Sequence, residues 1–233
     1  MSNFKAFKYI SLLLLQVIFT NSCSNGNYGK RINEGEIEYD IKYLDNVREN
    51  PLIALLPQKM KTVFKDNSTY SLIEGFMFKF AYITNHDKGQ NITLFQILDK
   101  KYSYLADTSE IPFGYRVGNN VKIIFTDKEK TLAGLKCKHA YTVFPSTQDT
   151  LEIYYTNEIG IENPNCNNPY KQINGVLMEF SVKMLGINMK FVGSSIKHKK
   201  INNDLFMLPE GYNLVSKTEM ERIINEYNKV VDK

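Results

Sequence analysis

Strict alternation of apolar and polar residues is the sequence feature that most constrains the fold. In residues 36–43 every second residue is Ile or Tyr, and the residues between them are Asp, Glu or Lys. A period of two places the apolar side chains on one face of a β-strand and the charged ones on the other. The same period recurs in a long ribbon at residues 175–199. Both segments predict strands with one buried and one solvated face.

Further strand-like segments follow one another along the chain, separated by turns. They are expected at residues 60–64, 68–84 with a break at Gly75, 91–98, 101–106, 121–126 with a turn at Asp127-Lys128, 136–144 and 150–156. Strands at intervals of about 8–12 residues are typical of an antiparallel sheet or barrel. An apolar run between two prolines at residues 50–57 favours a short helix or loop.

The C-terminal region has a helical pattern instead. Ser216 and Glu219 have the spacing of a capping box, in which the two side chains bond the first free backbone N–H groups of a helix. Apolar residues then recur at helical spacing, namely Met220, Ile223, Ile224 and Tyr227. We therefore expect a helix at residues 216–230.

The first 23 residues have the layout of a secretory signal. Two lysines precede the apolar residues 9–19, and a short polar patch then leads to Cys23. An apolar segment of this length is too short to span a bilayer as a helix, which takes about 20 residues. Ser22 before the cysteine resembles a lipobox, although Thr20 stands where leucine is commoner. We expect residues 1–22 to be a lipoprotein signal peptide and Cys23 to be acylated; the alternative is a plain signal peptide.

The chain after the cysteine divides into a tether and one domain. Residues 23–34 combine the acylated cysteine with a polar, glycine-containing tether, and residues 35–233 form a single β-rich domain. A diacylated, N-acylated cysteine carries several acyl chains, and stable membrane anchoring needs at least two. The tether has no acidic run, which favours the periplasmic face of the outer membrane. We therefore expect a cell-envelope location with the membrane as a partner through Cys23.

The charge of the mature chain excludes one class of partner. The signal segment holds two lysines and no acids, so its removal lowers the formal charge from +4 to +2. No basic stripe and no nucleic-acid-binding module is present in the sequence. We expect no nucleic acid partner.

Two cysteines remain after Cys23. Cys137 and Cys166 are an even pair in an oxidising compartment, which makes a disulfide one interpretation. A bridge over a loop of this length would stabilise the fold by about 3 kcal/mol in the chain-entropy model. Two free thiols, one buried in a strand, are the other interpretation.

Three short segments resemble a known group of proteins. They are residues 133–138 (AGLKCK), residues 173–179 (INGVLME), which match only the second half of a GLPGLI motif, and residues 208–212 (LPEGY) before the final helix. Together they resemble uncharacterised secreted proteins of Bacteroidota related to the GLPGLI-motif group. Their folds are similar to those of the lipoprotein carriers LolA and LolB.

The resemblance implies a particular fold and ligand. The fold is a strongly curved antiparallel sheet, a half-barrel, with a short N-terminal helix or loop and a C-terminal helix, and its apolar cleft can hold acyl chains. The residues that could line such a cleft are Phe76, Phe78, Phe80, Met178, Phe180, Met184, Met189 and Phe191. Ordinary core packing is the competing interpretation of these side chains.

No catalytic or metal site is expected from the sequence. His86, His139 and His198 lack metal-ligand spacing, and hydrolase and phosphate-binding motifs are absent. Cys137 and His139, two residues apart on one predicted strand, come nearest to a nucleophile pair. We expect a non-enzymatic lipoprotein without a cofactor that binds or carries an apolar, lipid-like ligand. The alternative is a structural or interaction subunit of an envelope protein assembly without a small-molecule ligand.

Overall fold

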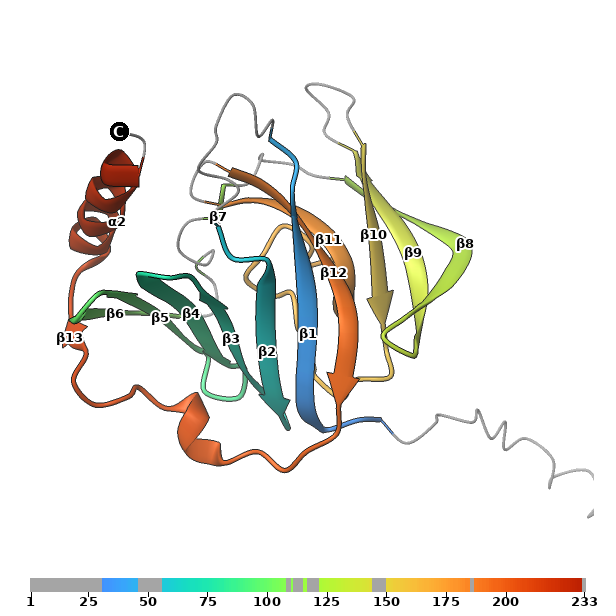
Figure 1. Ribbon diagram of the computed structural model, residues 1–233. Coiled ribbons are helices and arrows are strands. Elements are labelled where there is room, and N and C mark those ends of the chain that lie inside the picture. Colours follow the sequence, from blue (N-terminus) through green and yellow to red (C-terminus); the bar gives the residue numbers. More distant parts are fainter. Residues whose placement is uncertain are drawn as a thin grey trace, which may run out of the picture. The chain divides into compact units, whose positions relative to one another are not determined.

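The computed structural model describes residues 31–45, 56–107, 110, 115–116, 122–143, 150–184 and 187–231. The described part of the chain is mainly β, as predicted, with one α-helix near the C-terminus (Figure 1). No helix in this part is long and apolar enough to cross a membrane. The predicted signal peptide, the acylation site and most of the expected element at residues 50–57 lie outside the described residues.

Among the described residues there are thirteen strands, one 3₁₀ helix and one α-helix. They are β1 Glu34–Tyr43, β2 Lys59–Lys65, β3 Ser68–Glu74, β4 Phe78–Asn85, β5 Gln90–Ile97, β6 Lys100–Asp107, β7 Tyr115–Arg116, β8 Lys122–Leu132, β9 Leu135–Val143, β10 Thr150–Thr156, β11 Val176–Met184, β12 Ile187–Lys197, η2 Asn203–Phe206, β13 Asn213–Leu214 and α2 Lys217–Val231.

The strands form one sheet in the order β13-β6-β5-β4-β3-β2-β1-β12-β11-β10-β9-β8, and β7 pairs with β11. The neighbours are antiparallel except for β13, which runs parallel to β6. Most neighbours are consecutive in sequence, because short turns can join only antiparallel strands. The non-consecutive pairs are β13 with β6, β7 with β11, and β1 with β12, and the last joins the N-terminal strands to the C-terminal ones (Figure 1). The described strands leave the sheet open, with β8 and β13 at its ends.

At one position where a turn was predicted, the structure has a β-bulge within strand β8. We expected the chain to turn at Asp127-Lys128, but β8 continues through these residues and its register with β9 shifts between Phe125 and Glu129. The turn comes later, at Ala133-Gly134, where both residues have positive φ values, +50° and +81°. Two successive positive φ values define the hairpin turn whose twist matches that of the strands, and glycine adopts them without strain.

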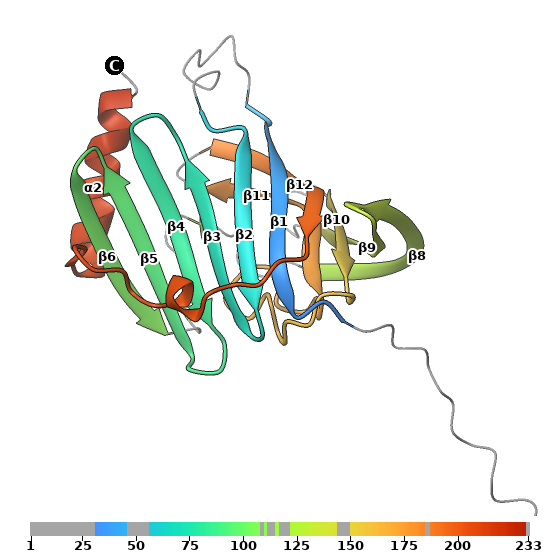
Figure 2. The same cartoon turned by 60° about the horizontal axis from the view of Figure 1, so that its bottom comes forward.

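The two faces of β3, β4 and β5 are covered by different segments. One face contributes Phe80 and Phe95 to the main core, which also contains Phe191 and Met178. The opposite face carries a smaller cluster of Ala81, Ile83, Ile92 and Leu94, against which Phe206 and Tyr212 pack. Figure 2 shows the segment after β12, with η2, crossing the strands on this second face. The strands are therefore buried on both sides where these segments lie.

Helix α2 packs on the main-core face. Met220 and Ile224 are buried in the main core, and the Tyr227 ring contacts the rings of Phe78 and Phe95 at centroid distances of 5.7 and 5.9 Å. The predicted cap is confirmed in part, since the Ser216 hydroxyl accepts a hydrogen bond of 3.2 Å from the backbone N–H of Glu219. The apolar stripe that predicted the helix is the surface by which it joins the sheet.

Candidate functional site

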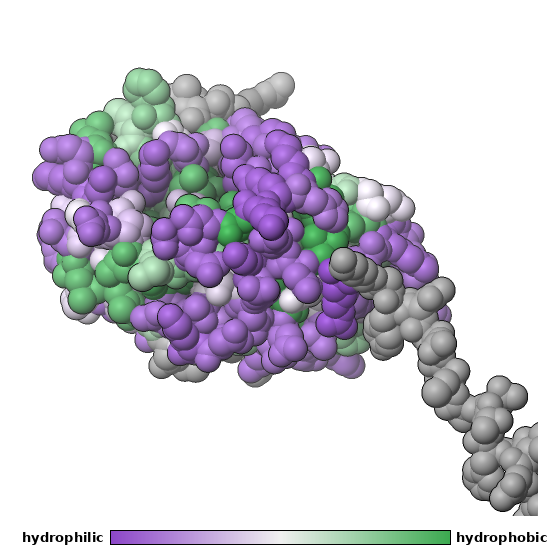
Figure 3. All heavy atoms as spheres, turned by 90° about the horizontal axis from the view of Figure 1, so that it is seen from below, coloured by the Kyte–Doolittle hydropathy of each residue, from purple (hydrophilic) through white to green (hydrophobic). Residues whose placement is uncertain are grey.

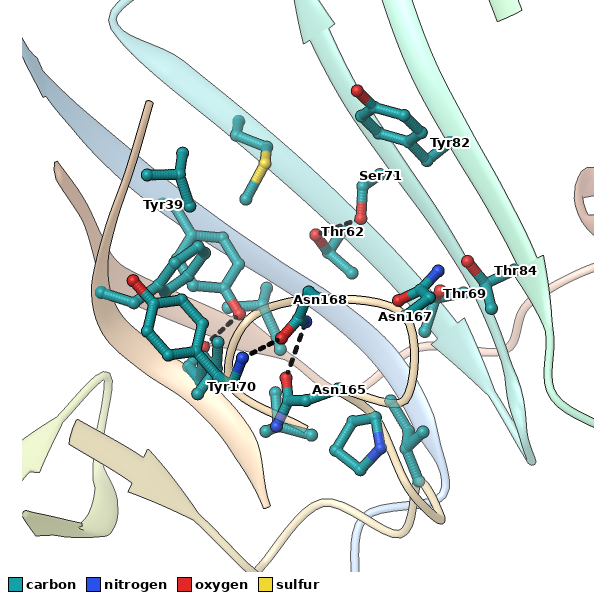
Figure 4. A pocket seen from close by; sticks show the side chains of 18 of the residues that line it. Tyr39, Thr62, Thr69, Ser71, Tyr82, Thr84, Asn165, Asn167, Asn168 and Tyr170 are labelled. Carbon is teal, nitrogen blue, oxygen red and sulfur yellow. Dashed lines mark hydrogen bonds between the residues drawn. The ribbon is translucent and has the colours of Figure 1, made fainter. Parts of the chain in front are cut away.

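A pocket lies on the main-core face of the sheet, between β1–β4, β11 and the loop at residues 161–170 (Figure 4). Its free volume is about 140 Å³. An engineered apolar cavity of about 150 Å³ holds one benzene molecule. The pocket therefore fits a small molecule, or one end of a larger one.

The strand register arranges the pocket floor in rows. Thr62, Ser71 and Tyr82 face one another across β2, β3 and β4. The next row along the strands contains Thr69 and Thr84. Residues opposite each other in an antiparallel pair point to the same face. The floor therefore has a polar strip formed by these two rows, and the hydroxyl oxygens of Thr62 and Ser71 are 2.9 Å apart.

A third row, on the other side of the Thr62 row, is mainly apolar. It contains Tyr39, Met60, Ile73 and Phe80, on strands β1 to β4 in turn. Tyr39 is fixed by a hydrogen bond of 2.9 Å from its hydroxyl to the carbonyl oxygen of Leu177. The pocket floor therefore offers apolar contact on one side and hydroxyl groups on the other.

The wall opposite the floor is a loop that is held by its own asparagines. The Asn165 amide nitrogen donates to the carbonyl oxygens of Ile173 and Gly175, at 2.8 and 2.9 Å. The Asn168 side chain donates to Asn165 and accepts from the backbone N–H of Tyr170. A loop has no regular backbone hydrogen bonds of the kind found between strands, and short-range side-chain hydrogen bonds take their place here. They fix a loop whose residues line the pocket (Figure 4).

The chemistry of the lining is neutral. Among the described residues that line the pocket there is no Asp, Glu, Lys, Arg or His, and they carry hydroxyl, amide, aromatic and aliphatic groups. Hydroxyl and carboxamide groups both donate and accept hydrogen bonds. A charged ligand would lose its hydration without gaining a counter-charge. The pocket thus favours an uncharged ligand with both polar and apolar surfaces.

Three of the eight residues expected to line an apolar cleft do line this pocket: Phe80, Phe180 and Met184. Met178, Met189 and Phe191 are buried in the core instead, and the Phe191 ring stacks on that of Phe180. Phe78 packs on α2. Phe76 was wrongly assigned to a cleft: it lies in the turn between β3 and β4 and is 100% exposed. Its apolar character gave no information on which way the turn would point.

Of the two interpretations of Cys137 and Cys166, the structure agrees with two free thiols, one of them buried in a strand. The structure holds Cys137 and Cys166 as free thiols, so the bridge is not formed. Cys137 is 0% exposed on β9, and its sulfur lies 3.5 Å from the carbonyl oxygen of Leu135. Burial raises the pKa of this thiol to about 11. Cys137 and His139 do not pair, because the His139 Nδ1 atom contacts the Thr126 hydroxyl at 2.7 Å.

A buried ionic cluster lies near His139. The side chain of Glu179, 7% exposed on β11, forms ion pairs with Lys190 at 2.5 Å and with Lys130. Burial acts to raise the pKa of Glu179, but the two lysines outweigh it and hold the pKa below its ordinary value. The Lys130 ammonium also lies 4.0 Å from the Tyr154 ring centroid. Each oxygen of the carboxylate is paired with one lysine, which indicates a structural role.

His198 is exposed in the segment after β12, and His86 lies in the turn between β4 and β5. Within the described ranges, no three His, Cys, Asp or Glu side chains come together in a way that could hold a metal ion.

Sequence reasoning missed the hydroxyl rows and the asparagine loop. The alternation in β3 contained a signal for them, because Ser71 and Ile73 share a face that Tyr70 and Leu72 do not.

Comparisons with known proteins give a similarity in fold. No protein-family model and no curated protein matches the chain. Two structures of PNGF-II, in space groups C2 and P21, align with TM-scores of 0.53 and 0.54 at 15% and 14% identity. Each alignment covers 83% of this chain and 33% of the PNGF-II chain, so this chain spans a third of its length. At this identity the similarity concerns the fold alone.

Proposed function

We propose that the protein is a non-enzymatic lipoprotein of the cell envelope that binds a small uncharged ligand in the pocket of Figure 4. The anchor would be Cys23, with the domain on the periplasmic face of the outer membrane. The amino-acid pattern of residues 1–23 supports this anchor. The ligand would be amphipathic, because hydroxyl rows and aromatic side chains line opposite parts of one pocket.

The pocket's volume and neutral lining carry the proposal. About 140 Å³ is less than the usual range of about 300–1,000 Å³ for pockets that enclose drug-sized ligands. A whole acyl chain does not fit such a volume. Of the lipid-like ligands that the sequence favours, the pocket therefore suits a small one, or the end of a longer one.

We further propose that the sheet is a strongly curved half-barrel. Register shifts at Glu38/Tyr39, Tyr154/Tyr155 and Phe125/Glu129 support this, because bulges bend and twist a sheet. In a flat sheet β8 would lie about 14 Å from β11, three strand spacings away. The ion pair between Lys130 of β8 and Glu179 of β11 is easier to form if the sheet is curved.

A binding experiment tests the ligand proposal. Ligand-detected NMR would compare phenol, benzene and palmitate with the full chain. We expect phenol to bind more tightly than benzene, and palmitate to bind more weakly than phenol, because only one end of its chain fits the pocket and its carboxylate finds no counter-charge there. Ser71→Leu would fill the pocket and abolish binding, whereas Leu72→Met, on the opposite face of β3, would leave it unchanged. Equal binding of phenol to both variants would contradict the proposal.

The anchor has its own test. Expression in a bacterium that acylates lipoproteins, followed by mass spectrometry of the N-terminal peptide, should show acyl chains on Cys23. Cys23→Ser should release the protein from the membrane fraction. An unmodified N-terminus after cleavage elsewhere would contradict the anchor without bearing on the pocket.

An interaction subunit of an envelope assembly is the second candidate. It is favoured by apolar side chains exposed in the segment after β12, namely Leu205, Met207 and Leu208. Hydrophobic patches reach the surface on the face shown in Figure 3. Exposed apolar patches mark interaction sites in many proteins. Loss of a crosslinked envelope partner in Met207→Ser, with phenol binding intact, would favour this candidate.

A further inference from the structure

Three segments that are far apart in sequence meet beside the pocket. Asn67, in the turn between β2 and β3, joins them with its side chain and backbone. Its amide nitrogen donates to Asp87 at 2.8 Å, and its amide oxygen accepts from the backbone N–H of Glu162 at 2.9 Å. Its backbone carbonyl accepts from the N–H of His86 at 3.1 Å. Asn67 therefore holds the turn at residues 86–89 against the loop at residues 161–170.

This arrangement brings a thiol and an imidazole into contact. The Cys166 sulfur lies 3.5 Å from His86 Nδ1. Both residues are half-buried, so each keeps part of its surface exposed to solvent. The backbone of Cys166 is fixed as well, since its N–H donates to the carbonyl oxygen of Asn163 at 3.1 Å. A thiol held next to an imidazole is the arrangement by which a histidine activates a cysteine.

The resting pair is neutral. Burial raises the pKa of the Cys166 thiol, and burial lowers the pKa of the His86 imidazole despite the neighbouring Asp87. In the tautomer with the ring proton on Nε2, the thiol donates to Nδ1. In this state His86 can take the thiol proton as the sulfur begins to react.

We propose that Cys166 and His86 form a reactive pair that takes up a low-molecular-weight disulfide. The thiol proton passes to His86 Nδ1 and the sulfur attacks one sulfur of the disulfide. A new S–S bond forms at Cys166 as the original S–S bond breaks. The departing thiolate takes up a proton from His86 and leaves as a thiol. Cys166 is oxidised to a mixed disulfide, and the other half of the disulfide is reduced.

The adduct would stand next to the pocket. Asn165 and Asn167, the two neighbours of Cys166 in sequence, both line it (Figure 4). A bulky group on Cys166 would press on this wall and weaken ligand binding. This consequence rests on the proposed function, whereas the formation of the adduct does not.

The test is site-resolved mass spectrometry of the reduced full chain after exposure to glutathione disulfide near pH 6. We expect the adduct on Cys166, while the buried Cys137 stays unmodified. His86→Gln should slow the reaction about a hundredfold, the lower end of what a positioned general base contributes. The matched control His198→Gln changes an exposed histidine elsewhere and should react as the wild type does.

Protection of Cys137 also reports whether a variant is folded. If Cys137 becomes reactive in His86→Gln, that variant is not properly folded. The rate at which Cys166 reacts is then compared between the folded wild-type chain and the wild-type chain unfolded in urea. Cys166 should then react faster in the folded chain, where the imidazole is in place. An unchanged rate in a folded His86→Gln variant, or a folded wild type no faster than the unfolded chain, would overturn the proposal.

Discussion

Replacing Glu179 by Gln should destabilise the fold by about 2 kcal/mol. Hydrogen bonds that involve a charged group contribute about 1.5–3 kcal/mol each. Glu179 makes two such contacts, with Lys130 and Lys190, from a carboxylate that is almost fully buried. The glutamine keeps the shape and can still accept a hydrogen bond. Both lysines are partly exposed and can turn toward water, so the loss stays below the cost of stranding a buried charge.

Thermal unfolding measures this loss. For a chain of this size about 1 kcal/mol shifts the midpoint by about 2–4 °C, so Glu179→Gln should lower it by roughly 4–8 °C. Glu152→Gln is the matched control, because the Glu152 side chain is 59% exposed near His139 and makes no close ion pair with a lysine in the described part of the chain. Its midpoint should change by no more than about 1–2 °C.

The dependence of folding stability on pH in the acidic range gives a second, independent test. Because the folded-state pKa of Glu179 is lowered, its stabilising effect is complete above the unfolded pKa and is lost as the pH falls through the folded pKa. The difference between wild type and Glu179→Gln should therefore begin to shrink below the unfolded pKa of about 4.3 and disappear only below the lower folded-state pKa. A Glu179→Gln variant as stable as wild type at pH 7 would refute the view that this cluster holds β8 to β11.

Three further perturbations test other parts of the fold. Burial lowers the folded-state pKa of His139, so the unfolded chain binds its proton first. Stability should fall as the pH drops from about 6.5 to the folded pKa, and denaturant unfolding at several pH values should show a smaller fall in His139→Gln. Phe95→Ala should cost about 3–5 kcal/mol in urea unfolding and the exposed Phe76→Ala less than about 0.5 kcal/mol; equal losses would contradict the assignment of the core. Ser216→Ala should cost about 1 kcal/mol through loss of the α2 cap, and Ser216→Asp should restore it.

The strands and the final helix were predictable because their signals are local. Alternation in residues 36–43 and 175–199 gave β1, β11 and β12, and the capping box gave the start of α2. The turn at Asp127-Lys128 was predicted wrongly. Polar residues suit a turn and a solvent-facing bulge equally well, and the pairing of β8 with β9 decides between them.

The pocket could be predicted only in part. Apolar strand residues had to be buried somewhere, which made Phe80, Phe180 and Met184 reasonable lining residues and Phe78 and Met178 equally reasonable ones. The pocket itself results from the loop at residues 161–170, whose asparagines gave no periodic signal. Its hydroxyl rows follow from the register of β2, β3 and β4, which a single strand does not specify.

The sequence by itself determined the class of fold, because the period of apolar residues decides whether a segment buries one face as a strand or as a helix. It did not determine which strand lies beside which, since β1 pairs with a strand some 150 residues later. Only the tertiary structure placed His86 in contact with Cys166 and buried Cys137 in the core as a free thiol. Such contacts depend on the packing of segments that are distant in sequence, and no local pattern encodes their distance.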